Sequence, residues 1–121
     1  MTPAARLAAT IAIVSDILGR AAAADRVLSD WQRRNRYAGA KDRRAIGEAV
    51  YAVLREQGMR RWLLEEAGAA ITPRLLVFAD AATPLQEWQK LCTGEKYAPP
   101  PLSEDEAAIL SHLPSDEAAP L

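Results

Sequence analysis

The stretch GAKDRRAIGEAVYAVLR, residues 39–55, decides the fold class of this chain. Large apolar side chains recur in it every three or four positions, a spacing that places them on one face of an α-helix. The side chains on that face are Ile46, Val50, Val53 and Leu54. Gly39 is the expected turn residue before the helix, and Asp42 stands in its first turn, where the helix dipole favours a carboxylate. We predict a helix from about Lys41 to about Gln57.

The segment before this stretch also has helical periodicity. A first helix is expected to begin at Thr2-Pro3, because threonine caps a helix start and proline lacks the amide that would stay unpaired there. Its predicted inward stripe is Leu7, Ile11, Val14 and Leu18, widened by Ala8 and Ile17. The side chains predicted on the far side are Arg6, Asp16 and Arg20. Gly19 is the expected site of a left-handed ending.

A second helix is predicted between the first helix and residue 39. It runs from about Ala23 to Arg34, and its inward side chains are Val27, Leu28 and Trp31. After the third helix, Gly58 either ends the helix or lets the chain bend and continue to a stop at Gly68.

Side-chain caps predict the later helices. Threonine–proline pairs stand at 72–73 and 83–84, and Gln86 follows the second threonine in capping-box register. Ser103 and Glu106 form another such box. Each pattern predicts a short helix that begins at the capping residue.

The whole pattern is that of an all-α protein, because the sequence contains no pair of segments in which apolar and polar residues alternate, as they do in paired strands. We predict a compact bundle of about six or seven short helices. The three prolines at 99–101 impose an extended segment. We therefore divide the chain into a helical domain, residues 1–94, and an arm, residues 95–121, with a proline-rich segment, a short helix and an acidic tail. The tail, residues 114–121, is expected to fray.

Charge is unevenly distributed although the formal net charge is only −1. Residues 1–63 hold twelve Arg and Lys against six Asp and Glu, whereas residues 64–121 hold three against ten. Such a layout favours a basic face for an anionic partner, together with an acidic tail.

The residue types that catalysis needs are sparse. No glycine-rich phosphate loop and no Cys/His cluster with zinc-ligand spacing is present. Cys92 is expected to be a small buried residue, and His112 has no evident serine or cysteine partner. We expect no catalytic residue, no metal site and no cofactor in this chain. No apolar run approaches the ~18 residues of a membrane span, so we expect no membrane partner and a cytoplasmic setting.

The basic face is expected at a helix–loop–helix corner within DWQRRNRYAGAKDRR, residues 30–44. Helical geometry places some of its cations outward, and arginine forks suit phosphate oxygens. The candidate RNA-binding strip is Arg33, Arg34, Arg36, Lys41 and Arg44, with Arg6, Arg60 and Arg61 as satellites. Tyr37 in the loop is a candidate for stacking on an unpaired base, and Arg43, at the core edge, is predicted to be structural. The competing interpretation is an ordinary solvated arginine-rich face.

The order of these features resembles the amino-terminal domain of bacterial 16S rRNA 5-methylcytosine methyltransferases, a domain related to the NusB antitermination factor. The segments that carry the resemblance are PAARLAA, ADRVLSDWQRRNR, GAKDRRAIGEAVYAVLR and GEKYAPPPLSEDE. It implies a NusB-like helical module that binds rRNA and precedes a catalytic domain. That domain would bind S-adenosylmethionine and attack cytosine through a cysteine, and neither its cofactor loop nor its length is found here. The chain thus looks like an excised domain or a truncated relative. The antitermination factor binds RNA through an arginine-rich start and first helix. Most of that surface has no counterpart here, because Arg6 is the only arginine in the matching segment, PAARLAA.

The function that follows is an expectation. We expect an RNA-binding accessory domain of an rRNA cytosine methyltransferase, not an enzyme by itself, whose partners are 16S rRNA and the catalytic domain of the parent chain. The alternatives are a protein-interaction module, or a packing domain that stabilises a catalytic neighbour. The sequence leaves the oligomeric state open.

Overall fold

Seven helices make up the regular structure of residues 1–115 and 117, which are the residues that the computed structural model describes. They are α1 (Pro3–Arg20), α2 (Ala24–Arg34), α3 (Ala40–Arg55), α4 (Gln57–Glu66), α5 (Pro73–Phe78), α6 (Leu85–Leu91) and α7 (Glu104–Ser111). The described residues contain no strand. The predicted all-α class is confirmed, at the upper end of the predicted number of helices.

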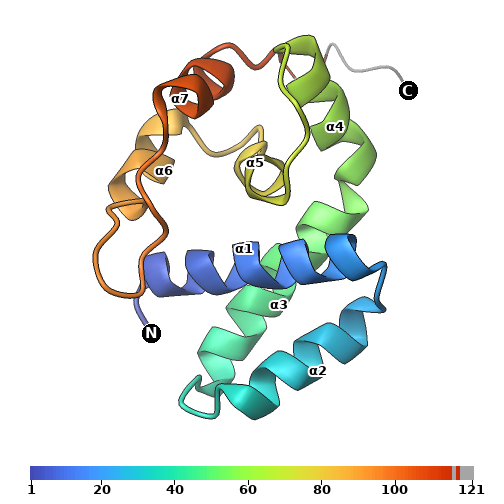
Figure 1. The fold of residues 1–121 in the computed structure, drawn as a ribbon, viewed down its shortest axis with the longest axis vertical. Coiled ribbons are helices and arrows are strands. Elements are labelled where there is room, and N and C mark those ends of the chain that lie inside the picture. The colour runs from blue at the N-terminus through green and yellow to red at the C-terminus, as the bar shows by residue number, and fades with distance from the viewer. Residues whose placement is uncertain (116, 118–121) are drawn as a thin grey trace.

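α1 lies across the middle of the fold, with α5 on one side and α2 on the other, and it crosses α3 (Figure 1). Its buried side chains are Leu7, Ala9, Thr10, Ile13, Val14 and Ile17. The predicted stripe was partly wrong, because Ile11 and Leu18 are only half-buried while Ile13 is 1% exposed. A helix covered from two sides buries a wider arc than one apolar stripe describes.

α3 carries the face that its periodicity predicted. Ile46, Val50 and Val53 are buried, and Leu54 is half-buried. The chain then bends at Glu56 and continues as α4, so a bend with continuation is present, but it lies two residues before Gly58, which stands inside α4. Gly68 follows α4 with a φ of 77°, so the predicted stop is confirmed.

Three of the four predicted side-chain caps are present. Thr2, Thr72 and Ser103 accept hydrogen bonds from the backbone N–H three residues later, at 3.0, 3.1 and 3.0 Å. The cap predicted at Thr83 is wrong, because its hydroxyl donates instead to Asp80 at 2.8 Å. The left-handed end of α1 is also misplaced in the prediction: it falls at Ala21, with φ 50°, and Gly19 stays inside the helix.

The arm packs on the helices that precede it. The guanidinium of Arg74 in α5 donates to Glu106 Oε2 at 2.9 Å and to the carbonyl of Pro100 at 2.8 Å. Leu110 of α7 is buried in the same apolar cluster as α1, α3 and α5. The division of the chain at residue 94 stays a prediction, and the predicted fraying concerns a tail of which 116 and 118–121 lie outside the described residues.

Candidate functional site

The corner between α2 and α3 is a short, tightly closed loop. The side-chain amide of Asn35 donates to the carbonyl of Trp31 at 2.8 Å, and the N–H of Ala38 donates to the carbonyl of Asn35 at 3.0 Å. Ala38 is buried, and its own carbonyl accepts from the Arg43 guanidinium at 3.0 Å. The backbone is thereby fixed at the point from which Arg36 and Tyr37 project into solvent.

Cationic side chains from both sides of this loop line one shallow hollow. We call it the arginine hollow, and its residues are Ser29, Gln32, Arg33, Arg36 and Arg43. Arg33 forms an ion pair with Asp30, with 2.5 Å between Nη2 and Oδ1. Neither Arg36 nor Arg43 has a carboxylate within 4.0 Å among the described residues. The hollow therefore presents guanidinium groups that are available to an anionic ligand.

Arg43 corrects one sequence-based assignment. It was predicted to have a mostly structural role at the core edge, and its hydrogen bond to the Ala38 carbonyl agrees with that role. Its side chain is nevertheless exposed and lines the hollow beside Arg33 and Arg36. The angular position of Arg43 around α3 did not indicate that it lines the hollow, because the hollow is formed by residues of both α2 and α3.

The predicted strip of five cations overlaps the hollow only in part, and all five side chains are exposed. Arg33 and Arg36 line the hollow, whereas Arg34, Lys41 and Arg44 are exposed but lie outside it. The charge of Arg34 acts on a carboxylate of α1: a hydrogen bond from Arg20 is the main reason why the pKa of Asp16 lies below its ordinary value, and Arg34 adds to that lowering against the opposing effect of burial.

Arg6 does not lie on the far side of α1, as the sequence suggested. Its Nε donates to Asp42 Oδ1 at 2.7 Å, and Oδ2 of the same carboxylate accepts from the N–H of Gly39 at 3.2 Å. The Arg6 hydrogen bond is the main cause that holds the pKa of Asp42 below its ordinary value, although burial opposes it, and the Gly39 N–H lowers it further. Asp42 is thus the predicted helix-start carboxylate, and it also forms an ion pair with Arg6.

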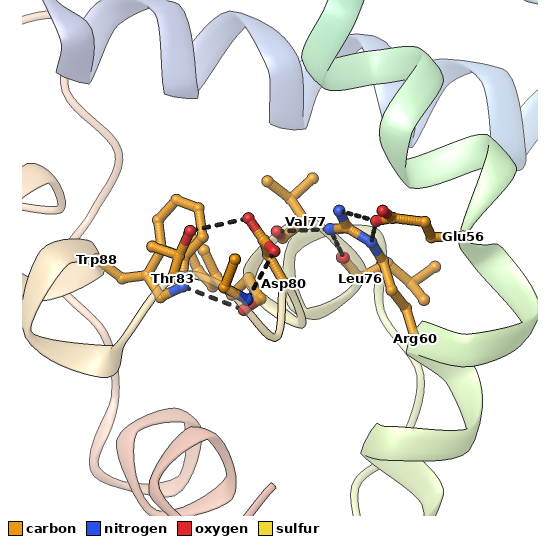
Figure 2. A network of polar contacts seen from close by, with 9 residues as sticks. Glu56, Arg60, Leu76, Val77, Asp80, Thr83 and Trp88 are labelled. Carbon is orange, nitrogen blue, oxygen red and sulfur yellow. Dashed lines mark hydrogen bonds and ion pairs between the residues drawn. The ribbon is translucent and has the colours of Figure 1, made fainter. Parts of the chain in front are cut away.

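Arg60 was a satellite candidate for the same surface, and this prediction is wrong. The side chain is 4% exposed, and Figure 2 shows it pointing from α4 towards α5. Nη1 donates to the carbonyls of Leu76 and Val77 at 2.9 and 3.0 Å, while Nη2 donates to Glu56 at 2.6 Å. Those carbonyls belong to the last turn of α5, where a helix leaves acceptors unpaired. Arg60 therefore has a structural role, and Arg61 beside it is partly exposed.

A second depression is lined by Tyr37, the residue that follows Arg36. We call it the aromatic groove, and it has a volume of about 610 Å³. It is lined by Met1, Thr2, Ala5, Ala8, Ala9, Trp31, Tyr37, Lys96 and Tyr97. Tyr37 and Tyr97 are 71% and 69% exposed, which is unusual for such large rings. Sequence reasoning identified Tyr37 and missed Lys96 and Tyr97, which are about sixty positions away along the chain.

The remaining reactive side chains lie apart from both depressions. Cys92 is a free, buried thiol, and burial raises its pKa. His112 follows α7 and is exposed beside the Ser111 hydroxyl. Within residues 1–115 and 117, no group of three or more potential metal ligands occurs, and no helix has the length and apolar character needed to cross a membrane. No family model, curated protein or solved structure matches the chain.

Proposed function

We propose that this chain is an RNA-binding helical domain that holds rRNA at the corner between α2 and α3. The observation that carries the proposal is the arginine hollow, in which guanidinium groups from α2, the loop and α3 face one space. Planar guanidinium groups make paired hydrogen bonds to phosphate oxygens and release the counterions that phosphates condense. Lys41 and Arg44, exposed on the first turns of α3, extend the positive potential beyond the hollow.

The resemblance to the amino-terminal domain of 16S rRNA 5-methylcytosine methyltransferases supports a narrower proposal. In it, the chain is a NusB-like accessory domain without catalytic residues, and an S-adenosylmethionine-binding domain of the parent enzyme methylates the cytosine. The all-helical architecture agrees with such a module. The hollow lies in the segments, residues 24–36 and 39–55, that carry most of the resemblance.

A salt titration tests RNA binding directly. The chain is titrated with a labelled 16S rRNA fragment at about 50 and 200 mM salt, the range over which phosphate contacts lose affinity steeply. With about three phosphate contacts, affinity should fall roughly 20- to 40-fold across that range. The double variant Arg33→Gln/Arg36→Gln should bind more weakly and with a shallower salt dependence.

The matched control is Arg55→Gln/Lys90→Gln, which removes the same charge from exposed positions that do not line the hollow. It should bind like the unchanged chain. Equal losses in both double variants would mean that only net charge matters, and the hollow would not be the site. No RNA binding, together with a stable nuclease-resistant complex in light scattering, would instead favour the protein-interaction alternative.

A further inference from the structure

The aromatic groove is lined by three parts of the chain that are distant in sequence. The first two turns of α1 supply small side chains, α2 and its following loop supply Trp31 and Tyr37, and the loop between α6 and α7 supplies Lys96 and Tyr97. A volume of about 610 Å³ lies within the range of small-ligand sites. Alanines 5, 8 and 9 give one wall without bulk or charge, so a flat apolar ligand has access to the aromatic rings.

Tyr97 occupies a backbone conformation that large residues rarely adopt. Its φ is 70°, in the left-handed region, and the only other non-glycine residue with positive φ among those described is Ala21. The turn is held closed by a hydrogen bond of 2.9 Å from the N–H of Gly94 to the carbonyl of Pro99. Pro101 packs so closely on Gly94 that a Cβ there would stand 3.0 Å from its ring. A strained residue held by a braced turn is typical of ligand-binding positions.

Positive charge at and next to the groove indicates the class of ligand. The Lys96 ammonium lies 5.1 Å from the centre of the Tyr97 ring, and no carboxylate among the described residues lies within 4.0 Å of it. The consecutive residues Arg36 and Tyr37 belong to the arginine hollow and to the aromatic groove respectively, so a second cationic position adjoins the groove. An apolar, ring-lined space with cationic side chains at and beside it fits a base that carries phosphate on both sides.

We propose that the aromatic groove holds one unpaired nucleobase of an RNA strand against Tyr37 and Tyr97. The flanking phosphates lie on Lys96 and on the arginine hollow. This inference rests on the proposed function, and it adds a base-stacking site to a phosphate-binding one. Stacking on an aromatic side chain depends little on base identity, so the groove selects single-stranded over double-stranded RNA rather than one sequence.

The test distinguishes the contribution of the bases to RNA binding from that of the phosphate charges. Two RNA strands of nine nucleotides are used, oligoadenylate and a strand of equal length that carries no bases, and their affinities are measured by fluorescence anisotropy. The unchanged chain should prefer oligoadenylate by about 5- to 150-fold, the range for one stacked base. Tyr97→Gly and Tyr37→Ala should reduce this preference, whereas Tyr97→Phe, which keeps the ring, should retain it. Circular dichroism and thermal melting verify that each variant is folded.

The Arg33→Gln/Arg36→Gln variant makes the two proposals distinguishable, since it should weaken binding of both strands by the same factor. If the unchanged chain binds both strands equally and this variant weakens both, the groove proposal fails and the arginine hollow stands. Failure to bind either strand would overturn both proposals. A base preference that survives in both ring-deleted variants would overturn the groove proposal, as would a dimer in light scattering that Tyr97→Gly dissociates, because a second copy of the chain would then occupy the groove.

Discussion

Arg6 and Asp42 join α1 to the start of α3 through a hydrogen bond of 2.7 Å between Nε and Oδ1. The other oxygen of the same carboxylate accepts from the backbone N–H of Gly39. One side chain therefore sets the crossing of two helices and the position at which α3 begins. The loop that carries Arg36 and Tyr37 ends at this point, so the geometry of the candidate site depends on a contact outside it.

Replacing Asp42 with asparagine should destabilise the fold while keeping the shape of the side chain. The variant loses the charge that Arg6 requires and weakens a helix-start interaction, so the melting temperature should fall by about 5 °C or more. The measurement is thermal unfolding followed by circular dichroism. Asp16→Asn is the control, because it breaks an exposed pair with Arg20 and such pairs contribute little. Equal shifts in the two variants would contradict the role assigned to Asp42.

Acid should destabilise the chain through Asp42 and Glu106. The pKa of Asp42 is lowered chiefly by Arg6, and the pKa of Glu106 is lowered because bonds from Ser103 and Arg74 outweigh its burial. A carboxyl whose folded pKa is depressed contributes stability above its unfolded pKa and loses it as the pH falls through the folded value. The urea concentration at the midpoint of unfolding should therefore stay constant from pH 7 to about 5 and decrease below about pH 4.5. The decrease should be smaller in Asp42→Asn, and an unchanged slope there would contradict this attribution.

Arg60→Met should cost about 2–4 kcal/mol of stability, because the carbonyls of Leu76 and Val77 lose a buried donor. Urea denaturation measures the loss, and Arg61→Met, at a partly exposed neighbour, should change the free energy of unfolding by about 0.5 kcal/mol or less. RNA affinity per folded molecule should not change in Arg60→Met. A selective loss of RNA affinity in Arg60→Met would return this residue to the binding surface.

Arg34 and Arg36 offer a matched pair of neighbouring cations. Arg36 lines the arginine hollow, whereas Arg34 lies outside it and its charge contributes to the lowered pKa of Asp16 on α1. Arg36→Gln should lower the salt dependence of RNA binding by about one phosphate contact, and Arg34→Gln should have a smaller effect. Titrations at several salt concentrations give both slopes, and equal slopes would indicate one continuous strip as first predicted.

Tyr97→Gly should stabilise the fold by about 0.5–1 kcal/mol even though it removes a large side chain. Glycine adopts a positive φ without the steric penalty of other residues, and the Tyr97 ring is mostly exposed. Ala21→Gly, at the other left-handed position, should stabilise the chain similarly and leave RNA binding unchanged. Destabilisation by Tyr97→Gly in urea unfolding would mean that the ring packs to hold the turn.

Features that depend on a few neighbouring residues were predictable from the sequence. The caps at Thr2, Thr72 and Ser103 each join a hydroxyl to an N–H three residues later, so both partners are visible in one short window. The Thr83 cap failed for an equally local reason. Asp80 lies three residues before it and competes successfully for its hydroxyl.

Features that join distant segments were not predictable from one helix at a time. The angle of Arg60 around α4 gives no sign that α5 will present two carbonyls to it. Likewise, Tyr97 and Tyr37 line one groove only because the loop after α6 returns to the first turns of α1. The candidate cations were found from charge, but the fold was needed to show that Arg33 and Arg36 line the hollow and that Arg6 pairs with Asp42.

The central position of α1 leaves this helix incompletely packed during protein synthesis. α1 is translated before the other described helices, yet it packs against α5, which is translated more than fifty residues later. At ordinary elongation rates this interval lasts on the order of several seconds. During that time α2 and α3 can cover only part of α1, and its side towards α5 stays open to chaperones or to other nascent chains. Ribosome-bound chains that end before residue 73 should therefore be cleaved in α1 by protease, and longer chains that expose α5 outside the ribosome should resist.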